Sequence, residues 1–107
     1  MSTDPSGQSL PPEQCATMAQ VRLGVDETDR AILNLLERRF GYMHAAARIK
    51  QRRDLVRDEG RKAQVIEAAR AQAQARALPD AEIAALWERL VEISIAYELA
   101  EWERLNG

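Results

Sequence analysis

Apolar side chains recur at helical spacing over one long stretch near the start of the chain, from Met18 to Arg53. The positions that carry this period are Val21, Val25, Ile32, Leu35, Leu36, Tyr42, Met43, Ala46 and Ile49. The stretch contains no proline, and the spacing is typical of one face of an α-helix. At about 1.5 Å per residue such a helix would extend roughly 50 Å, which is longer than a compact domain of this size is wide. It therefore requires a partner along its apolar face.

Two further helices are predicted after the long one. Residues 54–58 interrupt the apolar period and predict a connector, after which Asp58 can cap a helix that continues to about Ala77. The next proline cannot continue that helix, and Asp80 favours the start of a third, which runs to about Leu105. No segment has the alternation of a β-strand, so the sequence predicts an all-α fold of three helices: long, medium, long. The buried stripe of the third helix is expected to contain Ile83, Leu86, Trp87, Leu90, Ser94, Tyr97, Glu98 and Glu101.

Length and composition predict a single domain. The chain has 107 residues, of which 46% are hydrophobic, which is enough for one core and too little for two. We expect a helical domain over residues 14–107. The segment before it is rich in proline and serine, and we expect residues 1–13 to form a flexible arm.

Charge and cysteine content exclude several classes of protein. The net charge of -2 argues against nucleic-acid binding, which usually requires a basic excess. Cys15 is the only cysteine, so an intrachain disulfide and a cysteine-based zinc site are excluded. The N-terminal residues lack the basic and apolar regions of a signal peptide, and no apolar run approaches membrane-spanning length. We therefore expect a cytoplasmic protein that does not associate with membranes.

Long cationic side chains lie on or beside the apolar stripe of the first helix. Arg39 and Lys50 are 11 residues apart, hence only roughly 20° apart in azimuth and about 16 Å apart along the axis. Two cations that face one gap predict a site for a small dicarboxylate. Arg22 is 17 residues before Arg39, which places it about 25 Å away and roughly 100° round the helix. If Arg22 is functional, it must reach the site of a second, antiparallel subunit.

Polar residues interrupt the apolar stripe of the third helix. Ser94 and Glu98 are i, i+4 neighbours at positions where a core helix would carry apolar side chains. A buried carboxylate needs a partner. Burial would favour the protonated carboxyl and neighbouring cations would favour the ionised one, so the sequence leaves the protonation state of Glu98 open. Arg61, with Asp58, stands at the start of the second helix, where the helix dipole favours an anion.

These charged residues also permit an explanation without a ligand. An ion-pair network across a helical dimer would account for Arg39, Lys50 and Glu98. His44 has no serine, cysteine or aspartate arrangement around it and is interpreted as a surface or packing residue. Nothing in the sequence indicates a metal or a cofactor.

The chain resembles the all-α class of chorismate mutases, and the related isochorismate pyruvate lyases, in three segments. These are VRLGVDETDRAILNLLERRFGYMHAAARIK, VRDEGR and LVEISIAYELAEW. The residues that carry the resemblance in register are Arg22, Asp26, Asp29, Arg39, Lys50, Arg61, Ser94 and Glu98. The similarity extends over roughly residues 13–104. It implies an intertwined homodimer with two equivalent sites for chorismate or isochorismate, and no cofactor or metal.

The resemblance also implies a role for each site residue. Arg39 and the partner subunit's Arg22 would clamp the carboxylates of the substrate, and Arg61 would add a further cation.

Lys50 would bind a carboxylate and donate a hydrogen bond to the ether oxygen of the substrate. Asp58 and Ser94 would hold the ring hydroxyl and a carboxylate. Glu98 stands where the family commonly has Gln, so it must be protonated to donate to that oxygen. Lys62 stands where bacterial mutases often carry an acidic residue that contacts the hydroxyl.

The activity implied is the rearrangement of chorismate to prephenate. An isochorismate pyruvate lyase that forms salicylate and pyruvate is the alternative. The length of the connector from Lys50 to Arg61 is similar to that in the lyases, whereas Asp58 and Ser94 are more similar to the residues of the mutases. A 4-amino-4-deoxychorismate mutase is a third possibility. A helical dimer that serves as an interaction module remains the alternative outside the enzymes.

Overall fold

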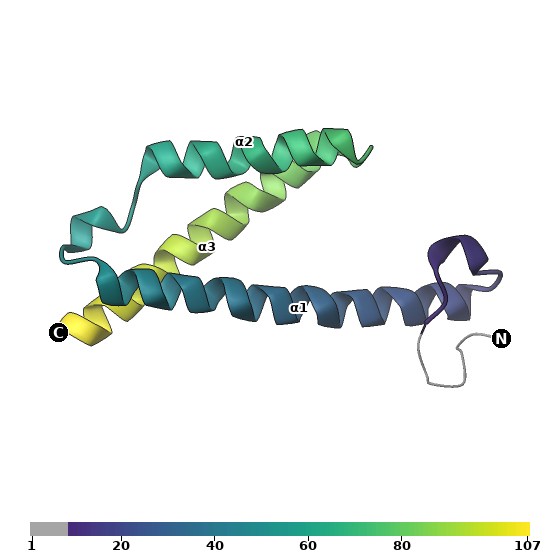
Figure 1. Cartoon of the computed structure of the whole chain (residues 1–107), viewed down its shortest axis with the longest axis horizontal. Coiled ribbons are helices and arrows are strands. Elements are labelled where there is room, and N and C mark those ends of the chain that lie inside the picture. The colour runs from purple at the N-terminus through teal and green to yellow at the C-terminus, as the bar shows by residue number, and fades with distance from the viewer. Residues whose placement is uncertain (1–8) are drawn as a thin grey trace. The chain divides into compact units, whose positions relative to one another are not determined.

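A computed structural model describes residues 9–107 of the protein (Figure 1). The helical elements are η1 (Pro12–Gln14), α1 (Met18–Ile49), η2 (Arg53–Leu55), α2 (Glu59–Ala75) and α3 (Asp80–Asn106), of which η1 and η2 are short 3₁₀ helices. The described residues contain no β-strand, so the predicted all-α fold of a long, a medium and a long helix is confirmed. Residues 1–8 of the predicted arm lie outside the described residues.

The chain divides into two compact units, and each is described by itself. The N-terminal unit ends at Arg39, and the C-terminal unit comprises Phe40–Gly107. Helix α1 contributes its first 22 residues to the N-terminal unit and the remainder to the C-terminal unit. The domain limits expected from the sequence, with an arm over 1–13, stay a prediction.

The start of α1 is fixed by a reciprocal pair of capping hydrogen bonds. The Thr17 hydroxyl oxygen accepts from the backbone N–H of Gln20 at 3.2 Å, while the Gln20 amide oxygen accepts from the N–H groups of Thr17 and Ala16 at 3.0 and 2.6 Å. This capping box satisfies N–H groups that have no partner within a helix. The preceding residues turn back over α1 (Figure 1), where the N–H of Ser9 donates to Glu27 Oε2 at 3.1 Å.

Helix α1 carries large apolar side chains that the single chain leaves exposed. Their exposed fractions range from 38 to 68%, at Met18, Val21, Val25, Ile32, Leu33, Leu35, Tyr42 and Ile49. So many exposed large apolar side chains on one helix are typical of an interaction site. None of the helices described between residues 9 and 107 is long and apolar enough to cross a membrane.

The core of the C-terminal unit lies where α2 packs against α3. Val91 and Ile95 of α3 are buried there together with Val56 of the connector, which is only 4% exposed. The partly buried apolar side chains around them are Val65, Ile66, Leu99 and Trp102. Because the connector contributes a buried residue, its course between α1 and α2 is tied to the core.

Helix α2 begins and ends with well-defined backbone hydrogen bonds. Asp58 Oδ1 accepts from the N–H of Arg61 at 2.9 Å, which confirms the predicted N-cap. At the other end the N–H of Leu78 donates to the Ala73 carbonyl at 2.9 Å, across Ala77, whose φ is 56°. This left-handed residue closes a Schellman motif and turns the chain towards α3.

The prediction for the end of α1 was wrong by four residues. The sequence indicates a helix to about Arg53, because no proline or glycine intervenes, but α1 ends at Ile49. The Lys50 carbonyl, which would bond to the N–H of residue 54 in a longer helix, instead accepts from the indole Nε1–H of Trp102 at 3.0 Å. A tertiary hydrogen bond therefore competes with continuation of the helix.

The predicted buried stripe of α3 is also partly wrong. Leu86 and Tyr97 are 57 and 36% exposed, while Ala84, Val91 and Ile95 are buried. The core-facing side of α3 is thus rotated relative to the expected stripe. Ser94 and Glu98, at 3 and 4% exposed, are buried as expected.

Candidate active site

A short polar contact in the C-terminal unit joins Lys50 to the buried Glu98. Lys50 follows the last residue of α1, and its N–H still donates to the Ala46 carbonyl at 2.9 Å. Its Nζ donates to Glu98 Oε2 at 2.7 Å. The Glu98 side chain is only 6% exposed and that of Lys50 is 28% exposed. A carboxylate buried to this extent requires a partner, as the sequence indicated, and the structure shows that Lys50 provides it.

Ser94 lies one turn before Glu98 on the same side of α3. Its hydroxyl donates to the Leu90 carbonyl at 2.7 Å. This bond to the backbone satisfies a buried polar group within a helix. Ser94 and Glu98 therefore place two oxygen-bearing side chains on one buried face of α3, and Glu98 contacts the Lys50 ammonium.

Asp58 and Arg61 stand together at the N-terminus of α2. The Asp58 carboxylate caps the helix through the Arg61 N–H, and both side chains are exposed. The N-terminus of a helix carries partial positive charge, to which the Arg61 guanidinium adds. The first turn of α2 is thus suited to an anionic group.

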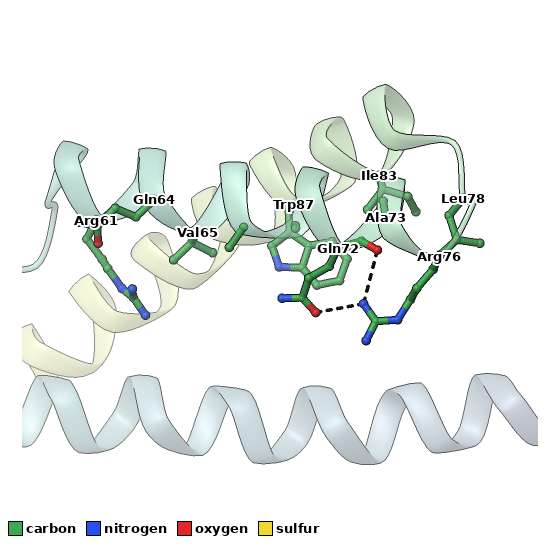
Figure 2. A pocket seen from close by; sticks show the side chains of 11 residues that line it. Arg61, Gln64, Val65, Gln72, Ala73, Arg76, Leu78, Ile83 and Trp87 are labelled. Atoms are coloured by element: carbon green, nitrogen blue, oxygen red, sulfur yellow. Dashed lines mark hydrogen bonds between the residues drawn. The ribbon is translucent and has the colours of Figure 1, made fainter.

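A cavity of about 370 Å³ lies along α2 and the first turns of α3 (Figure 2). Its lining residues are Arg61, Gln64, Val65, Ala68, Ala69, Gln72, Ala73, Arg76, Leu78, Ile83 and Trp87. Arg61 stands at one end and Arg76 at the other, with Trp87 between them (Figure 2). Of the predicted site residues only Arg61 lines this cavity, so the cavity does not gather Lys50, Ser94 and Glu98.

The two remaining predicted residues belong to the N-terminal unit. Arg22 and Arg39 both lie on α1, and Arg22 is exposed to solvent. The C-terminal unit by itself therefore holds five of the seven predicted site residues and brings Lys50 into contact with Glu98. The roles of all seven residues stay predictions.

Sequence reasoning missed a network that fixes the start of α2 against α3. Arg57 donates to both carboxylate oxygens of Glu92, at 3.1 and 2.8 Å. Lys62 pairs with Glu92 and Glu88, each at 2.8 Å. The signal was available in the sequence, because Glu88 and Glu92 are i, i+4 neighbours and Arg57 and Lys62 flank the predicted cap Asp58. The network holds the turn of chain that carries Asp58 and Arg61.

The same contacts shift the pKa values of Glu92 and Lys62. The hydrogen bonds from Arg57, and then those from Lys62, lower the pKa of Glu92 from 4.5 to about 2. Hydrogen bonds to Glu88 and Glu92 raise the pKa of Lys62. Glu92 is therefore ionised throughout the neutral and mildly acidic range.

The stability of the protein in acid should depend on the ionisation of Glu92. Because its pKa is lower in the folded protein, its contribution to stability is fully present above pH 4.5 and is lost as pH falls towards about 2. We expect Glu92→Gln to be less stable than the wild type near pH 7, with a difference that shrinks below pH 4.5. Urea unfolding at a series of pH values measures this. Glu67→Gln is the control, since Glu67 meets Arg70 only at 3.7 Å; identical acid profiles for Glu92→Gln and the wild type would contradict the prediction.

His44 forms a second polar cluster between the end of α1 and α3. Its Nδ1 lies 2.8 Å from Glu101 Oε2, and Arg104 donates to the same oxygen at 2.8 Å. Arg104, and then His44, lower the pKa of Glu101. The interpretation of His44 as a surface or packing residue agrees with its 41% exposed side chain and its contact with Glu101.

The helices and the Lys50–Glu98 pair define an all-α protein with a charged site against a buried helix face. The family described as Chorismate mutase type II matches residues 21–99, about three quarters of the chain. The protein therefore belongs to the chorismate mutase type II family, which confirms the resemblance noted in the sequence. No individual curated protein matches the chain.

Proposed function

We propose that this protein is a chorismate mutase that rearranges chorismate to prephenate. Family membership supports a mutase, and the observation that carries the proposal is the Lys50 ammonium held 2.7 Å from the buried carboxylate of Glu98. The reaction is a [3,3] shift: the ether C–O bond breaks while a C–C bond forms between the enolpyruvyl group and the ring. It requires no nucleophile, so the work of the protein is to bind, orient and stabilise charge.

Lys50 is the proposed donor to the ether oxygen. That oxygen gains negative charge as its bond to the ring breaks, and a preorganised cation lowers the barrier. An ammonium has three N–H donors, and Glu98 accepts one of them in this structure. The other two donors suit a carboxylate and the ether oxygen of one substrate.

Glu98 is the proposed second donor, in its protonated form. An ionised carboxylate only accepts hydrogen bonds and would repel an oxygen that gains negative charge. A substrate carboxylate beside Glu98 favours the protonated carboxyl, because two adjacent negative charges repel one another. Binding of the dianion would thus prepare Glu98 for its role.

The substrate carboxylates are assigned to the arginines. Arg39 and the partner subunit's Arg22 would clamp them, with Arg61 as a further cation, because guanidinium groups bind carboxylates through two parallel hydrogen bonds. Asp58 and Ser94 would meet the ring hydroxyl and a carboxylate.

A homodimer is proposed as the working form. Burial of the large apolar side chains exposed along α1 would be favourable, and α1 of a second copy offers an apolar surface of the same length. An antiparallel arrangement would carry Arg22 of each subunit to the site of the other. A cytoplasmic location remains part of the proposal.

Paired assays on the purified protein test the substrate. Chorismate loss with detection of prephenate is compared with isochorismate loss and salicylate fluorescence, each near pH 5 and pH 7.5. Prephenate as the main product supports the mutase. Salicylate formed at the higher efficiency would favour the lyase instead, and neither product would favour a non-catalytic helical dimer.

The role proposed for a protonated Glu98 predicts how turnover depends on pH. We expect kcat to fall with rising pH, because the ionised carboxylate cannot donate. Glu98→Gln should flatten this profile, since an amide donates at every pH. Glu101→Gln is the matched control one turn further along α3, and it should keep the wild-type profile. A wild type equally active from acid to alkaline pH would refute the role of Glu98.

A further inference from the structure

The backbone of Lys50 is anchored to α3 as firmly as its side chain. The last carbonyls of a helix have no partner within the helix, and that of Lys50 accepts from the indole Nε1–H of Trp102 at 3.0 Å. The ring of Trp102 packs against the core of Val56, Val91 and Ile95. The point where the chain leaves α1 is therefore tied to this buried cluster.

Glu98 and Trp102 form hydrogen bonds with the side chain and the backbone of Lys50, respectively. They are four residues apart on α3, and thus on one face of the helix. Glu98 holds the ammonium and Trp102 holds the carbonyl, at 2.7 and 3.0 Å. A lysine stem has four rotatable bonds, so the ammonium occupies one place only when both ends are held.

We propose that Trp102 is a positioning residue, whose indole N–H fixes the backbone of Lys50 and thereby the place of its ammonium at the reacting oxygen. The inference rests on the proposed role of Lys50. It assigns to Trp102 more than core packing, because packing requires only the ring, whereas the hydrogen bond requires the N–H. It also explains why α1 stops at Ile49 in a sequence that would continue as a helix.

Trp102→Phe tests the inference, because it keeps an aromatic ring and removes the donor. A misplacement of the order of 1 Å at a reacting centre costs about 10²-fold in rate, so we expect kcat to fall between about 10- and 100-fold. The KM should change far less, because the arginines that clamp the carboxylates are untouched. Glu103→Gln is the matched control: it removes only an exposed pair with Arg53 beside Trp102 and should leave both constants unchanged.

A double-variant cycle separates positioning from simple loss of stability. If Trp102 acts through Lys50, then Lys50→Ala combined with Trp102→Phe should be no slower than Lys50→Ala alone. Independent effects that multiply would overturn the inference. If Trp102→Phe fails to fold, benzothienylalanine at position 102 keeps the shape of the indole and replaces its N–H by sulfur; the same loss of kcat is expected.

The outcomes distinguish this inference from the proposed function. Wild-type kcat in Trp102→Phe, with Lys50→Ala inactive, would overturn the positioning role and leave the proposed function intact. Full activity of Lys50→Ala would overturn the role of Lys50 and the inference with it.

Discussion

Replacing Lys50 with alanine is expected to lower kcat/KM for chorismate by at least about 10²–10³-fold, which is the usual cost of removing one preorganised donor to a developing negative charge. The loss should appear mainly in kcat, because Lys50 acts on charge that forms only in the transition state. Steady-state formation of prephenate measures the effect.

Stability must be followed alongside activity in this variant. Glu98 is largely buried, and without Lys50 it loses the partner 2.7 Å away. Thermal unfolding of Lys50→Ala shows whether enough folded protein remains for the kinetic comparison. Arg53→Ala is the control, because it removes another cation of the same connector, one that forms only an exposed ion pair with Glu103. It should leave kcat/KM within about twofold of the wild-type value. A loss below about tenfold in Lys50→Ala would contradict the proposed role.

Mixing two inactive variants is expected to restore activity if each site is shared between subunits. Arg22→Ala and Lys50→Ala protomers each lack one part of every site in their own homodimers. In a mixed dimer one site receives Lys50 and Arg22 from the two unaltered positions, while the other carries both lesions. Random exchange makes half of the dimers mixed, so about a quarter of all sites should be active.

The recovery is measured after subunit exchange has been confirmed with a mass-tagged variant. Mixing Lys50→Ala with a Lys50→Ala, Arg22→Ala double variant is the matched control, because no combination of these chains contains an intact site. Activity that stays absent after confirmed exchange would show that Arg22 does not complete the partner's site. Activity in the Arg22→Ala homodimer itself would show that Arg22 is dispensable.

Side chains of helix α3 hold the connector and Lys50 in place within the C-terminal unit. Its Glu92 fixes the connector through Arg57, and its Glu98 and Trp102 fix the two ends of Lys50. The predicted site residues of this unit therefore stand on α3 or are held against it. Changes at Glu92, Glu98 or Trp102 should therefore affect the site, whereas a change at the exposed Glu103 of the same helix should not.

Much of the fold and part of the site were determined locally by the sequence. Helical periodicity predicted three helices, and Asp58 predicted the start of α2, because a cap and an apolar period act between residues close in the chain. Ser94 and Glu98 were recognised as buried polar residues, and the carboxylate of Glu98 was expected to need a partner. That this partner is Lys50 is seen only in the structure.

Only the tertiary structure decided the features that depend on contacts between distant residues. The end of α1 follows from the hydrogen bond between Trp102 and the Lys50 carbonyl, 52 residues apart. Burial of Val91 and Ile95 rather than Leu86 and Tyr97 follows from the side of α3 that meets α2. The ion pairs of Glu92 follow from the same packing. Helical periodicity gives an apolar face to each helix, but the free energy of packing one helix on another selects the rotation and the end points.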